Sequence, residues 1–181
     1  HYTSLMSGHN KWSQIKHKKA ATDAQKSKVF GKLARFIADE SKRARGDTSA
    51  PGLRAAIEKA KSLNMPSDNV TRAVKKGTGT DAGEMNRVVY EAYGPGGCAI
   101  IIDGLTDNRN RTSQEIKHLL SKNGGVLASP GSASWAFEKT LEGWLPQTHV
   151  SLSEEDNGSL LVIVEELEEN DDVQGVYTNA I

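Results

Sequence analysis

The chain has 181 residues, of which 36% are hydrophobic and 25% are charged, and this composition excludes a wholly disordered chain. No apolar run approaches the ~20 residues of a membrane-spanning helix. The single cysteine excludes an internal disulfide framework and a multi-cysteine zinc site. The net charge is zero, but residues 1–80 hold 17 lysines and arginines against 6 acidic residues, and residues 81–181 hold 6 against 17. This asymmetry predicts a polyanionic partner for the basic half.

The start of the chain is interpreted as an expression-vector remnant over residues 1–6, which includes the initiator methionine. Residues 7–19 are polar and basic and lack the apolar core of a secretory signal. We therefore expect a cytoplasmic protein. A mitochondrial-matrix protein that has lost its transit peptide would show the same pattern.

Three helices are predicted in the basic half. The first covers residues 20–45, in which one apolar stripe recurs at helical spacing: Val29, Phe30, Leu33, Phe36 and Ile37. The second covers residues 51–64, with Pro51 in its first turn. The third begins at Ser67 as the N-cap and stops at Gly77. The short connections predict a three-helix bundle over residues 7–76, followed by a glycine-rich linker over 77–83.

An acidic α+β domain is predicted over residues 84–181. Its elements are strands at 88–93 and 98–105, a helix at 112–122, strands at 132–137 and 144–152, a helix at 153–169, and a strand at 173–178. The glycine-rich segment 94–97 predicts a hairpin turn. Ser153 is expected to cap the last helix. The apolar run 160–164 is also compatible with a buried strand. This order predicts a sheet with helices on one face.

The strongest functional pattern is a run of basic residues interleaved with aromatic rings near the start of the chain. Lysine neutralises phosphate and an aromatic ring stacks on an exposed base, so this pattern is typical of nucleic-acid binding. A solvated basic arm without a partner is the alternative. The candidate nucleic-acid-binding residues of the basic half are Lys11, Trp12, Lys16, His17, Lys18, Lys19, Lys26, Lys28, Lys75 and Lys76.

A second candidate contact lies at residues 106–112, between a strand and a helix of the acidic half. Arg109 and Arg111 stand there, and a guanidinium presents a planar fork to phosphate or to base edges. Thr112 could cap the following helix, and Asp107 could brace either arginine. The alternative is a structural corner in which the polar side chains satisfy the turn.

Patterns of catalysis, metal binding or cofactor binding are not found in the sequence. The segment 94–99 formally fits the dinucleotide fingerprint, but strands are expected on both of its sides, whereas that motif needs a following helix. Cys98 stands in an apolar run and is expected to be an inert buried thiol. The acidic cluster 165–172 matches no EF-hand loop, so we expect a solvated helix end there. No catalytic residue, metal, cofactor, small-molecule substrate or membrane contact is therefore expected.

Several segments in the same order resemble the YebC family: residues 8–12, 15–21, 53–66, 90–97, 106–112 and 171–179. This family includes bacterial probable transcriptional regulators and a mitochondrial translational activator of cytochrome oxidase. The resemblance implies a helical bundle and two α+β domains, the third inserted within the second, which is expected to be ferredoxin-like. Here only residues 140–143 stand where a family member carries most of the third domain, so that domain is expected to be largely missing.

The resemblance implies no enzymatic activity. It implies DNA binding with transcriptional regulation, or binding to the ribosome and its RNA with an effect on translation. The basic half suits either polyanion. A protein-interaction module, whose basic half binds an acidic protein, is a further alternative.

Overall fold

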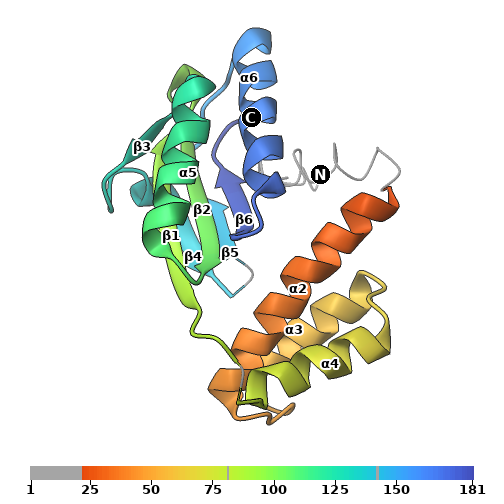
Figure 1. Ribbon diagram of the computed structural model, residues 1–181. Coiled ribbons are helices and arrows are strands. Elements are labelled where there is room, and N and C mark those ends of the chain that lie inside the picture. The colour runs from red at the N-terminus through yellow and green to blue at the C-terminus, as the bar shows by residue number, and fades with distance from the viewer. Residues whose placement is uncertain (1–21, 81, 142) are drawn as a thin grey trace, which may run out of the picture. The chain divides into compact units, whose positions relative to one another are not determined.

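The computed structural model describes residues 22–80, 82–141 and 143–181 in two compact units, which meet in the sequence between Met85 and Asn86 (Figure 1). The first unit is helical and the second combines helices with strands. The mixed α+β class predicted from the sequence is confirmed.

Three helices form the described part of the helical unit: α2 (Asp23–Ala44), α3 (Pro51–Ser62) and α4 (Ser67–Thr78). A capping box begins α2, because Gln25 N donates to Thr22 Oγ1 at 3.3 Å and Thr22 N donates to Gln25 Oε1 at 2.9 Å. The apolar stripes of the three helices meet in one core, which contains Leu33, Ile37, Leu53, Ala56, Ala60, Met65, Val70 and Ala73. Burial of these stripes supplies most of the stability of such short helices.

Three details of the helical unit differ from the sequence-based expectation. Val29 is 44% exposed and does not belong to the core stripe of α2. Ser67 is the first helical residue and not the N-cap, since Pro66 precedes it without a side-chain cap. Gly77 does not end α4 but lies inside it, packed against the backbone of α2. There a Cβ would overlap the carbonyl oxygen of Ala38, so the glycine serves helix packing and not helix termination.

The second unit is built on a four-stranded sheet in the order β3-β1-β2-β6, with every neighbouring pair antiparallel. The strands are β1 (Asn86–Tyr93), β2 (Ala99–Thr106), β3 (Val126–Ala128) and β6 (Val173–Thr178). Helices α5 (Arg109–Lys122) and α6 (Glu154–Glu169) cover one face of this sheet (Figure 1). Two helices on one face of a four-stranded antiparallel sheet are also the layering of a ferredoxin-like domain. Along this chain, the four strands of the sheet and the two helices follow one another in the order β-β-α-β-α-β.

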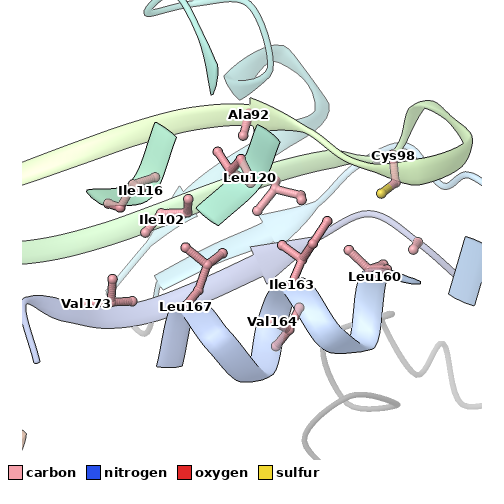
Figure 2. Packing of buried hydrophobic residues seen from close by; sticks show 12 residues of the cluster. Ala92, Cys98, Ile102, Ile116, Leu120, Leu160, Ile163, Val164, Leu167 and Val173 are labelled. Carbon is pink, nitrogen blue, oxygen red and sulfur yellow. The ribbon is translucent and has the colours of Figure 1, made fainter. Parts of the chain in front are cut away.

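The core strand β2 is buried on both faces of the sheet. Ile102 points towards α5 and α6, where Ile116, Leu120 and Ile163 meet it (Figure 2). Ile100 belongs to the same buried cluster. Ile101 points to the opposite face, which is covered by residues 133–137. A strand with helices on one side and a second layer on the other reads in the sequence as a continuous apolar run, as residues 98–102 do.

The second layer consists of a short 3-10 turn, η2 (Ser134–Ala136), and a two-stranded hairpin of β4 (Phe137–Thr140) and β5 (Gly143–Pro146). The predicted strand at 132–137 is therefore wrong over most of its length, and the predicted strand at 144–152 ends at Pro146. The short strand β3 was not predicted. By contrast, the hairpin turn at 94–97 is confirmed, with the 3-10 turn η1 (Pro95–Gly97) and positive φ angles at Gly96 and Gly97.

Helix α6 is confirmed over the strand alternative. Its N-cap is Ser153, whose Oγ accepts a hydrogen bond from Asp156 N at 3.1 Å. The acidic first turn lies at the positive end of the helix dipole, which it stabilises. The apolar run that suggested a strand is the buried face of this helix, with Leu160, Ile163 and Val164 in the core.

The β4–β5 hairpin is fastened to the sheet by aromatic side chains. Trp144 Nε1 donates to Asp103 Oδ1 at 3.0 Å, and Lys139 Nζ lies 4.6 Å from the centre of the Trp144 ring. Tyr177 of β6 lies directly against Gly143, where a Cβ would overlap its ring. The hairpin occupies the place at which the sequence resemblance predicted the missing third domain.

Candidate nucleic-acid interface

The exposed face of α4 carries three cations. Arg72, Lys75 and Lys76 are spaced three and four residues apart, which places them on one side of the helix. The opposite side, with Val70, Ala73 and Gly77, is buried against the rest of the helical unit. All three cationic side chains are exposed.

The C-terminal ends of α2 and α4 lie side by side. Ser41 Oγ donates to the carbonyl of Val74 at 2.7 Å, and a Cβ at Gly77 would lie 3.0 Å from Lys42 N. Gly46, which follows α2, is packed against Thr78 at the end of α4. This contact brings the last turn of α2 and its C-cap residue to the last turn of α4.

The contact gathers positive charge at one end of the helical unit, which we call the basic end: Lys42, Arg45, Lys75 and Lys76, together with Arg72 on the same side of α4. Arg72 stands in the middle of α4, and its guanidinium donates to Asn69 Oδ1 and to the Asp68 carbonyl, towards the start of the helix. Over the described ranges, none of these five residues makes an ion pair with a carboxylate. Cations near helix C-termini also offset the helix dipole, which contributes about 0.3–1 kcal/mol per residue. In that interaction the partners of the cations are the backbone carbonyls of the last helical turn, which are not ionised. The positive charge is therefore not neutralised and can still attract an external phosphate.

Of these five residues, the sequence analysis had selected only Lys75 and Lys76. A signal for Arg72 was present in its helical spacing to both lysines. No local signal identifies Lys42 or Arg45, since their place beside α4 follows from the packing of Gly77 and Gly46.

The remaining candidates of the basic half are more dispersed or lie outside the described residues. Near the start of α2, Lys26 is exposed and Lys28 is half-buried, and because they are two residues apart they do not face the same side. Lys28 has an interaction partner of its own. The six candidates that lie outside the described residues are Lys11, Trp12, Lys16, His17, Lys18 and Lys19.

The predicted corner at residues 106–112 is a capped helix start. Asn108 is the N-cap of α5, and its Oδ1 accepts a hydrogen bond from Arg111 N at 3.0 Å. Thr106 Oγ1 accepts from Asn108 N at 2.9 Å. The expectation that Thr112 caps this helix is wrong: Thr112 is buried in the first turn, and its hydroxyl donates to Asp172 Oδ2 at 2.7 Å.

The two arginines of this corner differ in their surroundings. Arg111 Nη2 lies 2.8 Å from Asp107 Oδ1 and 2.8 Å from Asp172 Oδ2, and the Asp172 side chain is only 7% exposed. Hydrogen bonds to Asp172 and then to Asp107 raise the pKa of Arg111 above its usual range. Asp107 thus braces Arg111, which is one of the two arginines that the sequence analysis named as its possible partner. The geometry favours a structural role for Arg111, which ties α5 to the start of β6.

Arg109 is exposed and its contacts are weaker. Its Nη2 donates to Asn86 Oδ1 at 3.3 Å, and its backbone carbonyl accepts a hydrogen bond from the Tyr90 hydroxyl at 3.4 Å. In residues 22–80, 82–141 and 143–181 no carboxylate pairs with Arg109. Of the two corner arginines, Arg109 is therefore the one whose charge faces solvent without a counterion.

Other kinds of site find no support in the described residues. No group of three or more His, Cys, Asp and Glu side chains there could hold a metal ion. None of the helices that the structure describes is long and apolar enough to cross a membrane. Cys98 is buried, and burial raises the pKa of its thiol. Within the acidic cluster, Glu166 pairs with Lys122 at 3.0 Å, and Asp172 pairs with Arg111.

A basic helical unit followed by an acidic sheet unit with helices on one face is the architecture of a known group of proteins. The sequence model of the TACO1/YebC N-terminal domain matches residues 10–80, and that of the TACO1/YebC second and third domain matches residues 85–142 and 140–180. The chain belongs to the TACO1/YebC family. The two stretches matched by the second model meet at the β4–β5 hairpin.

Individual relatives are named probable transcriptional regulatory proteins. One from Fervidobacterium nodosum is 50% identical over 173 residues, which are 93% of this chain and 68% of that protein. One from Petrotoga mobilis is 47% identical, covering 96% of this chain and 70% of its own length. For one from Thermosipho africanus the identity is 53%, over 74% of this chain and 54% of that protein. The chain thus spans about half to two thirds of the length of these relatives.

A solved structure has the same fold. The crystal structure of a conserved hypothetical protein from Aquifex aeolicus superposes with a TM-score of 0.83 at 32% identity, covering 94% of this chain and 96% of that chain.

Proposed function

We propose that this protein is a non-enzymatic regulator of gene expression that binds nucleic acid through the phosphate backbone, with duplex DNA as its target. The observation that carries the proposal is the basic end, where four exposed cations lie on adjoining helix ends and Arg72 stands one turn before them on α4, all without carboxylate partners in the described chain. The names of the relatives support a role in transcriptional regulation.

The basic end suits a duplex backbone for a physical reason. Helices α2 and α4 carry these cations, so the backbone that presents them is already ordered before DNA binds. Each cation that meets a phosphate releases a condensed counterion. If all five contact phosphates, the slope of log affinity against log salt is about −4.5 on duplex DNA and about −3.5 on a single strand. Phosphate contacts of this kind fix position and carry no sequence information.

The matched experiment compares two double variants with the same change in charge. Lys75→Ala with Lys76→Ala removes two cations from the basic end. Lys59→Ala with Lys61→Ala removes two from the last turn of α3, near the N-terminus of α4. The two pairs stand at opposite ends of α4, a 12-residue helix about 18 Å long.

The affinity for duplex DNA is measured by fluorescence anisotropy over a salt series, with circular dichroism to verify that each variant is folded. We expect the Lys75/Lys76 pair to make the slope less negative by about 1.8, and the Lys59/Lys61 pair to leave it nearly unchanged. Equal effects of both pairs would mean that a diffuse charge, and not the basic end, binds DNA. Absence of binding at low salt would remove the proposal. Tighter binding to ribosomal RNA of equal length would move the target from DNA to the ribosome.

A further inference from the structure

Helix α6 presents one narrow exposed stripe on the solvent side of the second unit. Five residues recur there three and four positions apart, so they lie on one side of the helix: Glu155, Gly158, Val162, Glu165 and Glu169. The valine is 42% exposed, and the other four residues are exposed as well. The buried residues of α6 lie on the opposite side, in the core of the unit (Figure 2). We call the five exposed residues the α6 stripe.

Two of the three carboxylates of the α6 stripe are not neutralised within the described chain. Over residues 22–80, 82–141 and 143–181, neither Glu155 nor Glu165 makes an ion pair with a cation. The carboxylate that pairs with Lys122 of α5 is that of Glu166, which lies outside the stripe. Glu169 has an interaction of its own. The charges of Glu155 and Glu165 therefore face solvent without a counterion.

The C-terminal end of α6 has a charge that disfavours the helix. Four of its last five residues, 165–169, are glutamates, and no basic residue stands in its last turn. The C-terminal end of a helix carries a partial negative charge, so a carboxylate there lowers the stability of the helix, whereas a cation raises it. A cationic surface docked at this end would offset both the glutamates and the helix dipole.

Gly158 leaves the backbone of α6 open in the first half of the stripe. A Cβ added there would meet nothing within 4 Å, so packing within the chain does not require a glycine at this position. In a helix interior glycine is also less favourable than alanine. The chain thus leaves this part of the helix uncovered, between Glu155 and Val162, where a partner can approach the backbone.

We propose that the α6 stripe docks the basic end of a second copy of this chain. The cations of the basic end are exposed and have no carboxylate partner in the described chain, while Glu155 and Glu165 are exposed and have no cationic partner there. Opposite charges steer such surfaces together and determine which faces meet. Pairing of two α6 stripes, or of two basic ends, would bring like charges together, so the contact is head-to-tail.

The head-to-tail contact has two consequences for the basic end. Each assembly keeps one basic end and one α6 stripe unoccupied at its two ends, so it grows with protein concentration unless it closes into a ring. A basic end docked on α6 is also closed to an external phosphate, so DNA and the α6 stripe compete for the same cations. This competition rests on the proposed DNA binding, whereas the self-association does not.

The test measures self-association of the full chain by sedimentation velocity over a series of protein concentrations. The salt is raised from about 10 mM to about 0.15 M, which shortens the Debye length from about 30 Å to about 8 Å. The basic-end variant is Lys75→Glu with Lys76→Glu, and the stripe variant is Glu155→Lys with Glu165→Lys. Each variant alone carries like charges on both surfaces. An equimolar mixture of the two restores opposite charges, because each variant retains the surface that the other has lost.

Two matched controls reverse the same number of exposed charges elsewhere. Lys59→Glu with Lys61→Glu reverses two cations of α3. Glu84→Lys with Glu138→Lys reverses two carboxylates outside α6. Circular dichroism verifies that each variant is folded.

We expect the wild type to self-associate at low salt and to do so more weakly at the higher salt. An exposed ion pair strengthens association about 1.4- to 5-fold, and a reversal turns an attraction into a repulsion. Each double reversal should therefore weaken self-association about 4- to 800-fold. The mixture should associate again, and both controls should associate as the wild type does.

A wild type that stays monomeric at low salt would overturn the proposal, as would an equal loss of association in the controls or a mixture that fails to associate. Association that persists in the basic-end variant would overturn it too, because another basic segment would then bind α6. A duplex of about one helical turn, added to the wild type, should dissolve the assemblies. If it binds and the assemblies remain, the competition is refuted. If it does not bind and the assemblies remain, the proposed DNA binding fails and the self-association stands.

Discussion

Replacement of Gly77 by alanine tests the packing that creates the basic end. In most helices this change stabilises, since alanine has the higher helix propensity by about 1 kcal/mol. Here the added Cβ would overlap the Ala38 carbonyl oxygen and lie 2.7 Å from Ser41 Cβ. Backbone atoms cannot rotate away, so α4 has to move from α2, and the hydrogen bond from Ser41 Oγ to the Val74 carbonyl is lost with that movement.

The sizes of three free-energy contributions decide whether Gly77→Ala is less or more stable than the wild type. Overpacking costs about 1–3 kcal/mol, and the lost hydrogen bond about 0.5–1.5 kcal/mol. Helix propensity returns about 1 kcal/mol, and the net expectation is a destabilisation of about 0.5–3.5 kcal/mol. The matched control is Gly31→Ala in α2, where an added Cβ meets nothing within 4 Å and the propensity gain stands alone.

The assay is urea unfolding of both variants and the wild type, followed by circular dichroism at the helical band. We expect opposite signs: Gly31→Ala raises the free energy of unfolding by up to about 1 kcal/mol, and Gly77→Ala lowers it. If Gly77→Ala stabilised the protein as Gly31→Ala does, the close approach of α2 and α4 would be wrong, and with it the basic end.

Two further predictions concern pH. Burial opposes ionisation of Glu91, but hydrogen bonds from backbone N–H groups, including those of Ala133 and Ser134, outweigh it and lower its pKa below the usual 4.5. The stabilisation from Glu91 is therefore present above that value and is lost as the pH falls through the lowered pKa. In urea titrations from neutral to acid pH, the stability advantage of the wild type over Glu91→Gln should shrink, and a constant difference would contradict this. Burial, with a smaller contribution from Asp103, raises the pKa of Tyr177 from 10.0 to about 12. Stability that depends on its neutral phenol is therefore present below pH 10 and lost between pH 10 and about 12. Tyr177→Phe should lose less free energy of unfolding over that interval, and an equal loss would refute it.

Sequence patterns predicted the elements whose signals are local. The apolar spacing of α3, the Ser153 cap of α6 and the glycine turn after β1 all depend on neighbouring residues, and all three are found. The three-residue strand β3 was missed because it is too short to show an alternating pattern. The turn η2 was misread as a strand because Glu91, far back in the sequence, satisfies its backbone N–H groups.

The residues of the candidate site likewise divide into those that the sequence identifies and those that only the tertiary structure identifies. The excess of lysine and arginine in the first half is visible in composition alone, and Lys75 and Lys76 could be selected from it. The structural role of Arg111 depends on Asp172, which is 61 residues away in the sequence. The convergence of Lys42 with α4 depends on a glycine at a helix contact. Features set by tertiary contact leave no pattern in a single sequence.

The β4–β5 hairpin also makes this protein a scaffold for adding a folded domain. Thr140 and Gly143 are paired across the strands, so the chain leaves and re-enters the sheet at points about 5 Å apart. The side chain of Leu141 between them is fully exposed. A fluorescent or affinity domain whose own termini lie close together could be joined here without stretching either strand. Trp144 and Tyr177 hold the hairpin on the sheet from below its tip, so such an insertion leaves the core of the second unit intact.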